Sequence, residues 1–319
     1  MGGRLATDCV AISHDPADLE DGGFWAVSTN FEGGFVAAKF ATVIESEFSH
    51  CNWSPVAGDW SSSFSRVEYC NYVESIRESI AQGWVYQVNA CRVLSVKHSV
   101  ENLRGLFSQL LVGNPAPWAS YLEIPGLNIA SASPELFLER NGSLVKTSPI
   151  KGTQRLEEDG FGNKDKAENV MIVDLMRNDF GRICESGTVE VPRLLAHEDH
   201  PGLRHLVSDI QGQIRPELTW KEILESLSPP GSISGAPKSS AISVIRDHES
   251  SRGPYCGALG WVQGKNAQLS VAIRIFWKDE ELHFGTGAGI TWNSDAGQEW
   301  EETQLKASRL ISLAGGKLP

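Results

Sequence analysis

Residues 118–148 read WASYLEIPGLNIASASPELFLERNGSLVKTS, and this stretch decides the class of fold that the sequence predicts. Strand-forming residues gather in three short segments, at 118–124, 135–140 and 143–148, with turn residues between them. From about residue 85 to residue 148 the pattern is therefore typical of β-strands.

Helical patterns flank this β-rich stretch. Ser65 and Glu68 form a capping box ahead of an apolar helical face, and Gly83 follows as a stop signal. Further helices are expected at about 163–177, at 220–227 with Thr219 and Glu222 as a capping box, from Pro237 as first helical residue, and at about 296–313. Strands return at 269–278 and 281–285. This non-alternating order predicts an α+β fold in which antiparallel sheets carry helices on the outside.

The 319 residues show no internal repeat and no long Pro/Gly/Ser linker, so we expect a single domain over residues 1–319. Short strands and turns fill residues 1–60, and the rest of the core lies in residues 61–315. The start, MGGRLATDCV, lacks the basic and apolar blocks of a signal peptide, and no apolar run is long enough for a membrane span. We therefore expect a cytoplasmic protein.

Charge and cysteine content exclude several classes of function. A formal net charge of -12 without a basic cluster argues against a nucleic-acid partner. The six cysteines contain no CxxC pair, so neither a zinc site nor a disulfide framework is expected. An acidic protein can still bind an acidic small molecule through a divalent cation, an inward-facing arginine or the N–H groups at a helix start.

Two acidic pairs share the same spacing. Asp165 and Glu168 are three residues apart on one predicted helix, and Glu299 and Glu302 are three apart on another, so each pair occupies one helical face. Carboxylates on a face that is otherwise apolar are costly unless they are paired or metal-bound, and oxygen ligands suit Mg²⁺. Solvated helix edges, or ion pairs with Lys166 or Lys306, also explain the spacing.

Small residues mark two further candidate sites. PPGSISGAPK (229–238) leads into a helix start, which offers free N–H groups to an anion, although a tight helix entry needs no ligand. GTGAGI (285–290) indicates close approach of the backbone to a ligand or to a neighbouring strand. Arg274, inside an apolar strand, needs a carboxylate partner from a ligand or from the protein.

Three side chains are candidates for catalysis. Lys151 stands at a strand end beside apolar residues, where a lysine can act as a nucleophile or simply be solvated. Glu135 in Ser-Pro-Glu could be a general acid or a surface charge. His205 could transfer protons or be a satisfied core histidine.

Taken in order, these segments resemble the chorismate-utilising enzymes, the family of anthranilate synthase and aminodeoxychorismate synthase large subunits. The matching stretches span about residues 66–313 and are YQVN (86–89), SPELF (133–137), PIKGT (149–153), AENVMIVDLMRND (167–179), HLVS (205–208), SISGAPK (232–238), RGPYCGALG (252–260), AIR (272–274), GAGI (287–290) and EWEET (299–303). The resemblance implies two large antiparallel β-sheets packed as a sandwich with flanking helices and the active site between the sheets.

The resemblance also implies roles for particular residues. Glu168 and Glu302 would bind Mg²⁺, with Asp165 and Glu299 supporting the metal shell. Lys151, Glu135 and His205 would be the catalytic residues. The residues that would hold the substrate are Gly152, Thr153, Ser232, Gly235, Lys238, Tyr255, Arg274, Gly287, Ala288 and Gly289.

Three positions indicate which branch of the family the chain resembles. Water-adding members have a general-base lysine where this chain has Gln87, and anthranilate-forming members usually have alanine where it has Lys151. PIKGT and Asn169 are similar to the aminodeoxychorismate synthase branch. That resemblance implies a folate-pathway enzyme, leading to p-aminobenzoate, which combines chorismate with ammonia from a glutamine amidotransferase through a covalent adduct on Lys151. The alternatives are an anthranilate synthase component 1 and a non-catalytic chorismate-binding subunit.

The N-terminal part, residues 1–60, is shorter than in these relatives, where it forms a tryptophan-binding pocket. Regulatory tryptophan binding is therefore not expected.

Overall fold

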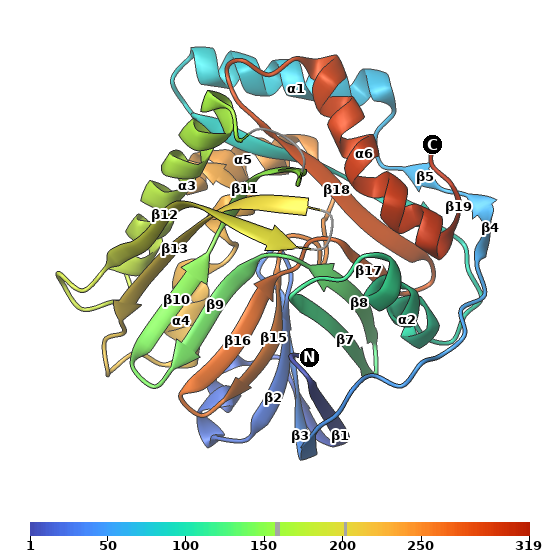
Figure 1. Ribbon diagram of the computed structural model, residues 1–319, viewed down its shortest axis with the longest axis vertical. Coiled ribbons are helices and arrows are strands. Elements are labelled where there is room, and N and C mark those ends of the chain that lie inside the picture. Colours follow the sequence, from blue (N-terminus) through green and yellow to red (C-terminus); the bar gives the residue numbers. More distant parts are fainter. Residues whose placement is uncertain (157–159, 201–202) are drawn as a thin grey trace.

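The computed structural model describes residues 1–156, 160–200 and 203–319. Within these residues two large antiparallel sheets dominate the fold (Figure 1). The ten-stranded sheet has the order β1 (Arg4–Ser13), β3 (Phe35–Glu45), β2 (Phe24–Thr29), β15 (Ala258–Gln263), β16 (Asn266–Val271), β9 (Leu136–Asn141), β10 (Leu144–Ser148), β13 (Leu203–Gln213) and β11 (Ile150–Arg155), with β12 (Glu190–His200) beside β13.

The seven-stranded sheet has the order β14 (Gly235–Ala236), β6 (Gln87–Val96), β18 (Leu282–Ile290), β17 (Ile275–Lys278), β8 (Leu127–Ser133) and β7 (Trp118–Ile124), with β5 (Ser61–Ser62) also paired to β6. A small parallel pair joins β4 (Val56–Asp59) to β19 (Gly315–Lys317). The predicted α+β class with two large antiparallel sheets is confirmed.

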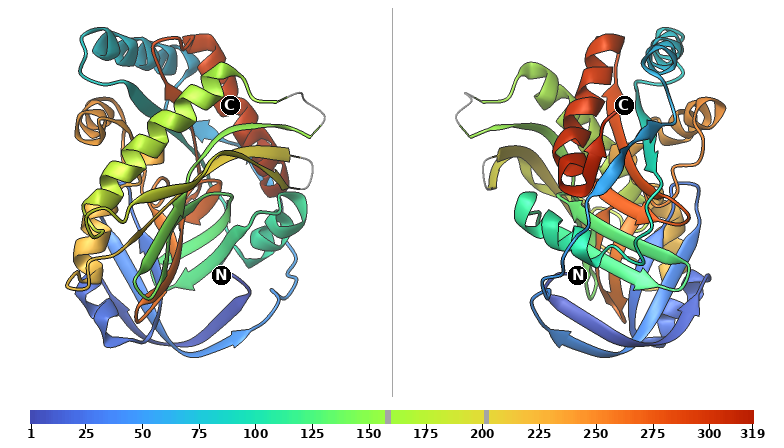
Figure 2. Two further views of the ribbon diagram at one scale, coloured as in Figure 1. Left: turned by 60° about the vertical axis from the view of Figure 1, so that its left-hand side comes forward. Right: turned by 90° about the vertical axis from the view of Figure 1, so that its right-hand side faces the viewer.

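The helices are η1 (Pro16–Asp21), α1 (Arg66–Ala81), α2 (Arg104–Gly113), α3 (Asn163–Gly181), α4 (Trp220–Leu227), η2 (Gly231–Ile233), α5 (Lys238–His248) and α6 (Ala296–Ala314). The capping boxes predicted before α1 and α4 are both present. Pro237, expected as the first helical residue, is instead the N-cap of α5, so the helix begins one residue later, at Lys238. In Figures 1 and 2, α1 and α6 lie at the end of the molecule opposite β1, β2 and β3.

Helix α2 was missed because it interrupts the stretch that the sequence predicted as β-like. Its start at Leu103 has no side-chain cap, and its residues Gly105–Ser108 and Leu110 are all buried. A helix that is largely apolar shows no clear amphipathic period, so pattern alone does not separate it from a buried strand.

The expected strand over residues 269–278 was wrong in one respect, because the chain leaves one sheet and enters the other within it. Strand β16 ends at Val271 in the ten-stranded sheet, and β17 begins at Ile275 in the seven-stranded sheet. Arg274, at the crossing, has a φ of 52°. This left-handed conformation is unfavourable for a residue with a side chain, so it is kept only where the surrounding structure requires it.

Apolar side chains form two clusters. The larger includes Val27, Phe137, Leu269 and Val88, from both sheets, and the smaller places α2 and α6 against β6, β8, β17 and β18. Burial of this apolar area is the main stabilising contribution to such a fold. None of the helices in the described residues combines the length and the apolarity that a membrane span requires.

Candidate active site

Four residues from separate elements converge at the crossing between the sheets. They are Glu135 before β9, Lys151 in β11, Ser232 in η2 and Arg274 between β16 and β17. The Glu135 carboxyl accepts a hydrogen bond from the Ser232 side chain and lies near the charges of Lys151 and Arg274. Its backbone is held by the crossing itself, since Val271 N donates to Glu135 O at 3.0 Å. Residues up to 139 positions apart in the chain, such as Glu135 and Arg274, therefore form one cluster.

Glu135 is 5% exposed. Burial raises the pKa of its carboxyl, and the opposing effects of Lys151, the Ser232 hydrogen bond and Arg274 do not cancel that rise. A carboxyl group that keeps its proton to higher pH than usual is suited to give that proton to a leaving group.

Lys151 is half-buried, and its Nζ donates to the carbonyl oxygen of Ser232 at 3.0 Å. Its neighbour Gly152 has a φ of 88°, and a Cβ at that position would come within 2.9 Å of the Phe161 ring and 3.1 Å of Asp165 Cβ. Glycine is therefore required here by both conformation and space. The close contact brings β11, with Lys151, against the N-terminal turn of α3, which carries Asp165 and Glu168.

The two acidic pairs lie on α3 and α6 and affect one another's ionisation. Burial raises the pKa of Glu168, an effect strengthened by the negative charges of Glu302 and Asp165 and opposed by Lys151 and Lys164. Burial likewise raises the pKa of Glu299. For Glu302 burial acts in the same direction, but the nearby lysines, foremost Lys306, prevail and leave its pKa below the ordinary value.

Lysines from the same helices approach these carboxylates. Lys306 Nζ lies 2.7 Å from Glu302 Oε1 and also donates to the carbonyl oxygen of Gly287 at 3.0 Å, while Lys164 Nζ lies 3.9 Å from Glu299 Oε1. The ion pair with Lys306 that sequence reasoning left open is thus present. Glu302 nevertheless lies close enough to Glu168 for its negative charge to raise the pKa of Glu168.

A divalent cation suits the chemistry of this donor set. The described residues contain no group of three or more His, Cys, Asp or Glu side chains already gathered as metal ligands. Mg²⁺ does not require such a group, because it commonly takes one or two protein carboxylates and completes its shell with water and substrate oxygens. Burial is the main cause of the raised pKa of Glu168, and the negative charges of Glu302 and Asp165 add to it, so a cation bound here would stabilise the ionised carboxylate.

The glycine-rich wall is the segment of β18 over residues 285–290, which packs closely against β6. A Cβ at Gly287 would lie 2.6 Å from Cys91 Sγ, and one at Gly289 would lie 2.5 Å from Gln87 Nε2. The neighbouring strand β6 thus supplies the close approach at these two glycines, with Ala288 buried between them. Gln87 is 2% exposed, and its Oε1 has no hydrogen-bond partner within the described part of the chain. A buried acceptor without a partner is costly, which favours a ligand with a donor group at this place.

Tyr255 and Arg252 contact the two strands of this wall, at Gly285 of β18 and at Asn89 of β6. A Cβ at Gly285 would collide with the Tyr255 ring at 2.1 Å, and burial raises the pKa of the Tyr255 hydroxyl well above its usual range. Arg252, which is 1% exposed, pairs with Glu249 at 2.7 Å and donates to the carbonyl oxygens of Asn89 at 2.7 Å and Ile233 at 3.3 Å. It therefore joins β6 to the loop that holds Ser232.

Sequence reasoning did not single out Arg252, although it lies in the matched motif RGPYCGALG (252–260). An arginine directly before Gly253 in a turn reads as a surface charge. Its burial depends on Glu249, three residues earlier, and on carbonyl groups from distant elements, so no local signal reveals it.

The remaining predicted residues lie in β13, α3 and β14. His205, in β13, is buried opposite Thr153 of β11, whose side chain is outside the described part of the structure. Asn169 accepts from Ser208 at 2.5 Å and donates to Leu206 O, so it links α3 to β13. Gly235 pairs with Val88 at the edge of β6, and a Cβ there would lie 2.3 Å from Gln87 O.

Lys238 occupies a different environment from Lys151. Its Nζ lies 2.6 Å from Asp179 Oδ2 and donates to Leu227 O at 3.1 Å, so its charge is held by the last turns of α3 and α4. Burial lowers the pKa of Lys238 and raises that of Asp179, while each partner opposes the other's shift.

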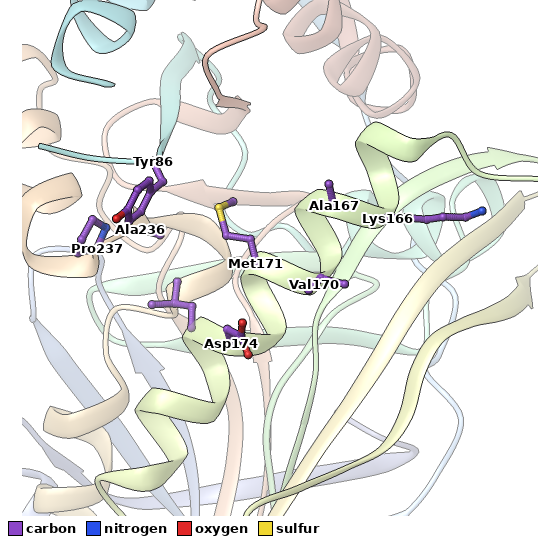
Figure 3. A pocket seen from close by; sticks show the side chains of 9 residues that line it. Tyr86, Lys166, Ala167, Val170, Met171, Asp174, Ala236 and Pro237 are labelled. Carbon is purple, nitrogen blue, oxygen red and sulfur yellow. The ribbon is translucent and has the colours of Figure 1, made fainter. Parts of the chain in front are cut away.

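A shallow apolar pocket of about 660 Å³ lies on another side of α3. Figure 3 shows Tyr86 and Pro237 facing Met171 across it, with Lys166 at its far end. Lys166 and Asp174 are the charged residues that line it. Since Lys151, Glu135 and the acidic pairs are not part of its lining, this pocket is separate from the cluster described above.

Comparison with known proteins is consistent with this geometry. The chain is 35% identical over 290 residues to anthranilate synthase component 1 of Aquifex aeolicus, covering 85% of this chain and 56% of that protein. It is also 35% identical over 290 residues to aminodeoxychorismate synthase component 1 of Escherichia coli, covering 86% of this chain and 64% of that protein. The chain thus spans between half and two thirds of the length of these relatives.

Solved structures share the fold. Anthranilate synthase component I from Streptococcus pneumoniae superposes with a TM-score of 0.85 at 23% identity, covering 97% of this chain and 91% of that one. An isochorismate synthase from Bacillus anthracis superposes with a TM-score of 0.81 at 19% identity, covering 97% and 93% of the two chains. The family described as chorismate binding enzyme matches residues 35–312, and the chain therefore belongs to the family of chorismate-utilising enzymes.

Proposed function

We propose that the chain is an aminodeoxychorismate synthase component 1, which adds ammonia to C4 of chorismate in place of the C4 hydroxyl. The observation that carries the proposal is the position of Lys151. Its charge acts on both Glu135, a buried carboxyl with a raised pKa, and Glu168, a candidate metal ligand. The groups that we propose as nucleophile, proton donor and metal ligand therefore lie near one another.

In the proposed first step the neutral amine of Lys151 forms a bond to C2 of the substrate. Both conjugated double bonds of the ring shift by one position, the C4–O bond breaks, and Glu135 gives its proton to the departing hydroxyl, which leaves as water. In the second step ammonia forms a bond to C4, both double bonds shift back, the bond between C2 and Lys151 Nζ breaks, and Lys151 leaves as the free amine. Glu135 then takes a proton from the new ammonium group, which restores the starting state of the enzyme.

The metal would be held by Glu168 and Glu302, with Asp165 and Glu299 beside them. Mg²⁺ bound there would neutralise and orient a substrate carboxylate. Arg274, close to Glu135, would pair with an anionic group of the substrate. The Ser232 carbonyl oxygen, 3.0 Å from Lys151 Nζ, orients the amine before it attacks.

Gln87 favours ammonia over water as the second reactant. An amide cannot remove a proton from water, but its unpartnered Oε1 can accept a hydrogen bond from ammonia, which is itself a nucleophile. Gln87 lies against Gly289, on the wall that the family resemblance assigns to the substrate.

Anthranilate synthase is the second candidate function, and it is favoured by one observation. The chain is as similar to the Aquifex aeolicus anthranilate synthase component 1 as to the Escherichia coli aminodeoxychorismate synthase component 1, at 35% identity to each. The two activities use the same substrate and differ in the ring position that receives the amino group.

Product analysis separates the candidates. The purified chain is incubated with chorismate, Mg²⁺ and ammonium, aminodeoxychorismate lyase is added, and the aromatic product is identified by chromatography and mass spectrometry. We expect p-aminobenzoate when the lyase is present and none without it. Anthranilate in both reactions would instead establish the second candidate, and unchanged chorismate would establish a binding subunit. Repeating the assay with glutamine in place of ammonium, with and without a glutamine amidotransferase subunit, tests the expected partner.

A further inference from the structure

A polar pocket of about 420 Å³ opens on the seven-stranded sheet, and neither Lys151 nor Glu135 lines it. Its lining residues are Ser61, Ser62, Ser63, Val93, Ser95, Ser250, Ser251, Gly253, Trp277, Asp279, Glu281 and His283. Six of these are serines, and an aspartate and a histidine lie among them. The proposed amination of chorismate uses none of these residues.

Three of the lining residues form a continuous hydrogen-bonded relay. Ser95 Oγ lies 2.8 Å from His283 Nδ1, and His283 Nε2 lies 2.9 Å from Asp279 Oδ1. With the proton on Nε2, the histidine donates to Asp279 and leaves Nδ1 free to accept the serine proton. A serine, a base and a carboxylate that orients the base are the constellation of nucleophilic acyl transfer, and it is recognised by these roles and distances.

The fold keeps this relay in place. Ser95 of β6 and His283 of β18 are directly paired across the sheet, and Trp277 of β17 stacks on the histidine ring with centroids 5.2 Å apart. Asp279 lies in the turn before β18, where it also accepts the backbone N–H of Glu281. The Asp279 side chain is 64% exposed. Partial desolvation raises the pKa of its carboxyl, but hydrogen bonds from the backbone and from His283 prevail and leave that pKa below its ordinary value.

The pocket also contains a donor for an oxyanion. The Ser63 hydroxyl oxygen accepts from Val93 N at 3.0 Å, so the hydroxyl keeps its own proton for a ligand in the pocket. A donor that can stabilise developing negative charge is the second requirement of acyl transfer.

This site is distinct from the chorismate site, although both use β6 and β18. Ser95 pairs with His283 at one end of the two strands, and Asn89 pairs with Gly289 at the other. Six residues of extended strand separate the two pairs, which is about 20 Å.

We propose that Ser95 is a nucleophile for small esters, with His283 as its base and Asp279 as the residue that orients the base. Ser95 Oγ forms a bond to the carbonyl carbon while His283 takes its proton, and the alcohol leaves with that proton. Water then hydrolyses the acyl-serine and restores Ser95. Because Asp279 and Glu281 line the pocket, uncharged or cationic esters are favoured over carboxylate-bearing ones.

The first test uses diisopropyl fluorophosphate, which traps nucleophilic serines, followed by peptide mass mapping of the labelled protein. We expect the label on the peptide that contains Ser95. The wild-type protein alone decides this point, so it does not depend on how a variant folds. A wild-type protein that is not labelled at Ser95 would overturn the proposal and leave the relay as a purely structural hydrogen-bonded row.

The second test measures hydrolysis of p-nitrophenyl acetate by the folded wild type and three variants. Ser95→Ala should abolish burst release of p-nitrophenolate, and His283→Gln should slow it by about 10²-fold or more. Ser61→Ala is the matched control, since Ser61 donates to the carbonyl oxygen of Ser95 without taking part in the relay, and should retain the burst. Equal rates in His283→Gln and wild type would also overturn the proposal. Conversion of chorismate should be unchanged in Ser95→Ala, so this result is independent of the proposed amination.

Discussion

Two regions of the candidate active site contain buried carboxyl groups, and the charges around those groups differ between the two regions. At the crossing between the sheets, the single carboxyl of Glu135 lies near two positive side chains, and its pKa is nevertheless raised. Between α3 and α6, four carboxylates lie among lysines, with pKa values raised at Glu168 and Glu299 and lowered at Glu302. The first arrangement suits a proton donor, whereas the second is the one that we propose as a cation site. Family motifs supply acids to both, and only their surroundings separate the two roles.

The largest effect is expected from Lys151, which joins the two regions. Lys151→Ala removes the proposed nucleophile and should lower kcat for p-aminobenzoate formation by at least about 10³-fold. Lys166→Ala is the matched control, because Lys166 is an exposed lysine on another side of α3 (Figure 3). Mg²⁺ binding, measured by calorimetry, should persist in both variants. Full activity of Lys151→Ala in the coupled lyase assay would remove the covalent role.

Glu135→Gln tests the proposed proton donor at the crossing between the sheets. The amide keeps the shape but has no acidic proton, so kcat should fall by about 10²–10³-fold. Because burial raises the pKa of Glu135, the protonated acid persists to higher pH than an ordinary carboxyl, and wild-type kcat should fall as pH rises through that pKa. That basic limb of the kcat profile should disappear in Glu135→Gln. A variant that keeps the same basic limb would show that another group donates the proton.

Glu302→Gln tests the proposed cation site between α3 and α6. Loss of one ligand should raise the Mg²⁺ concentration for half-maximal activity by about 10–100-fold, with a smaller change in kcat at saturating metal. Glu301→Gln is the control, since Glu301 is exposed on the same helix and pairs with Arg66 at 3.1 Å. If the metal requirement of the two variants were the same, Glu302 would not be a ligand.

The smallest effect on catalysis is expected from Lys238, whose charge is held by Asp179 rather than by either region. Lys238→Met leaves Asp179 buried without its partner and should lower the free energy of unfolding by about 3–5 kcal/mol, measured by urea denaturation. The double variant Lys238→Met with Asp179→Asn should recover part of that loss. The KM for chorismate should change less than about threefold. A tenfold increase in KM in the stable double variant would instead support the substrate role that the family resemblance implies.

Much of the local structure was predictable. The capping boxes at Ser65 and Thr219 placed the starts of α1 and α4, and turn residues separated the strands β7, β9 and β10. These signals are local, because each depends on hydrogen bonds or conformations within a few residues. Helix α2 and the break at Arg274 were not predictable in this way, since burial and the transfer between two sheets decide them.

The sequence by itself determined the family, the two acidic pairs and the presence of a lysine in PIKGT, because motif order and helical spacing are properties of the chain. Only the tertiary structure decided the environment of each group. It brought Glu135, Lys151, Ser232 and Arg274 together from four elements, bound Lys238 to Asp179, buried Arg252 and aligned Ser95 with His283. The physical reason is that ionisation and reactivity depend on desolvation and on charges close in space, and these are fixed only when the sheets have packed.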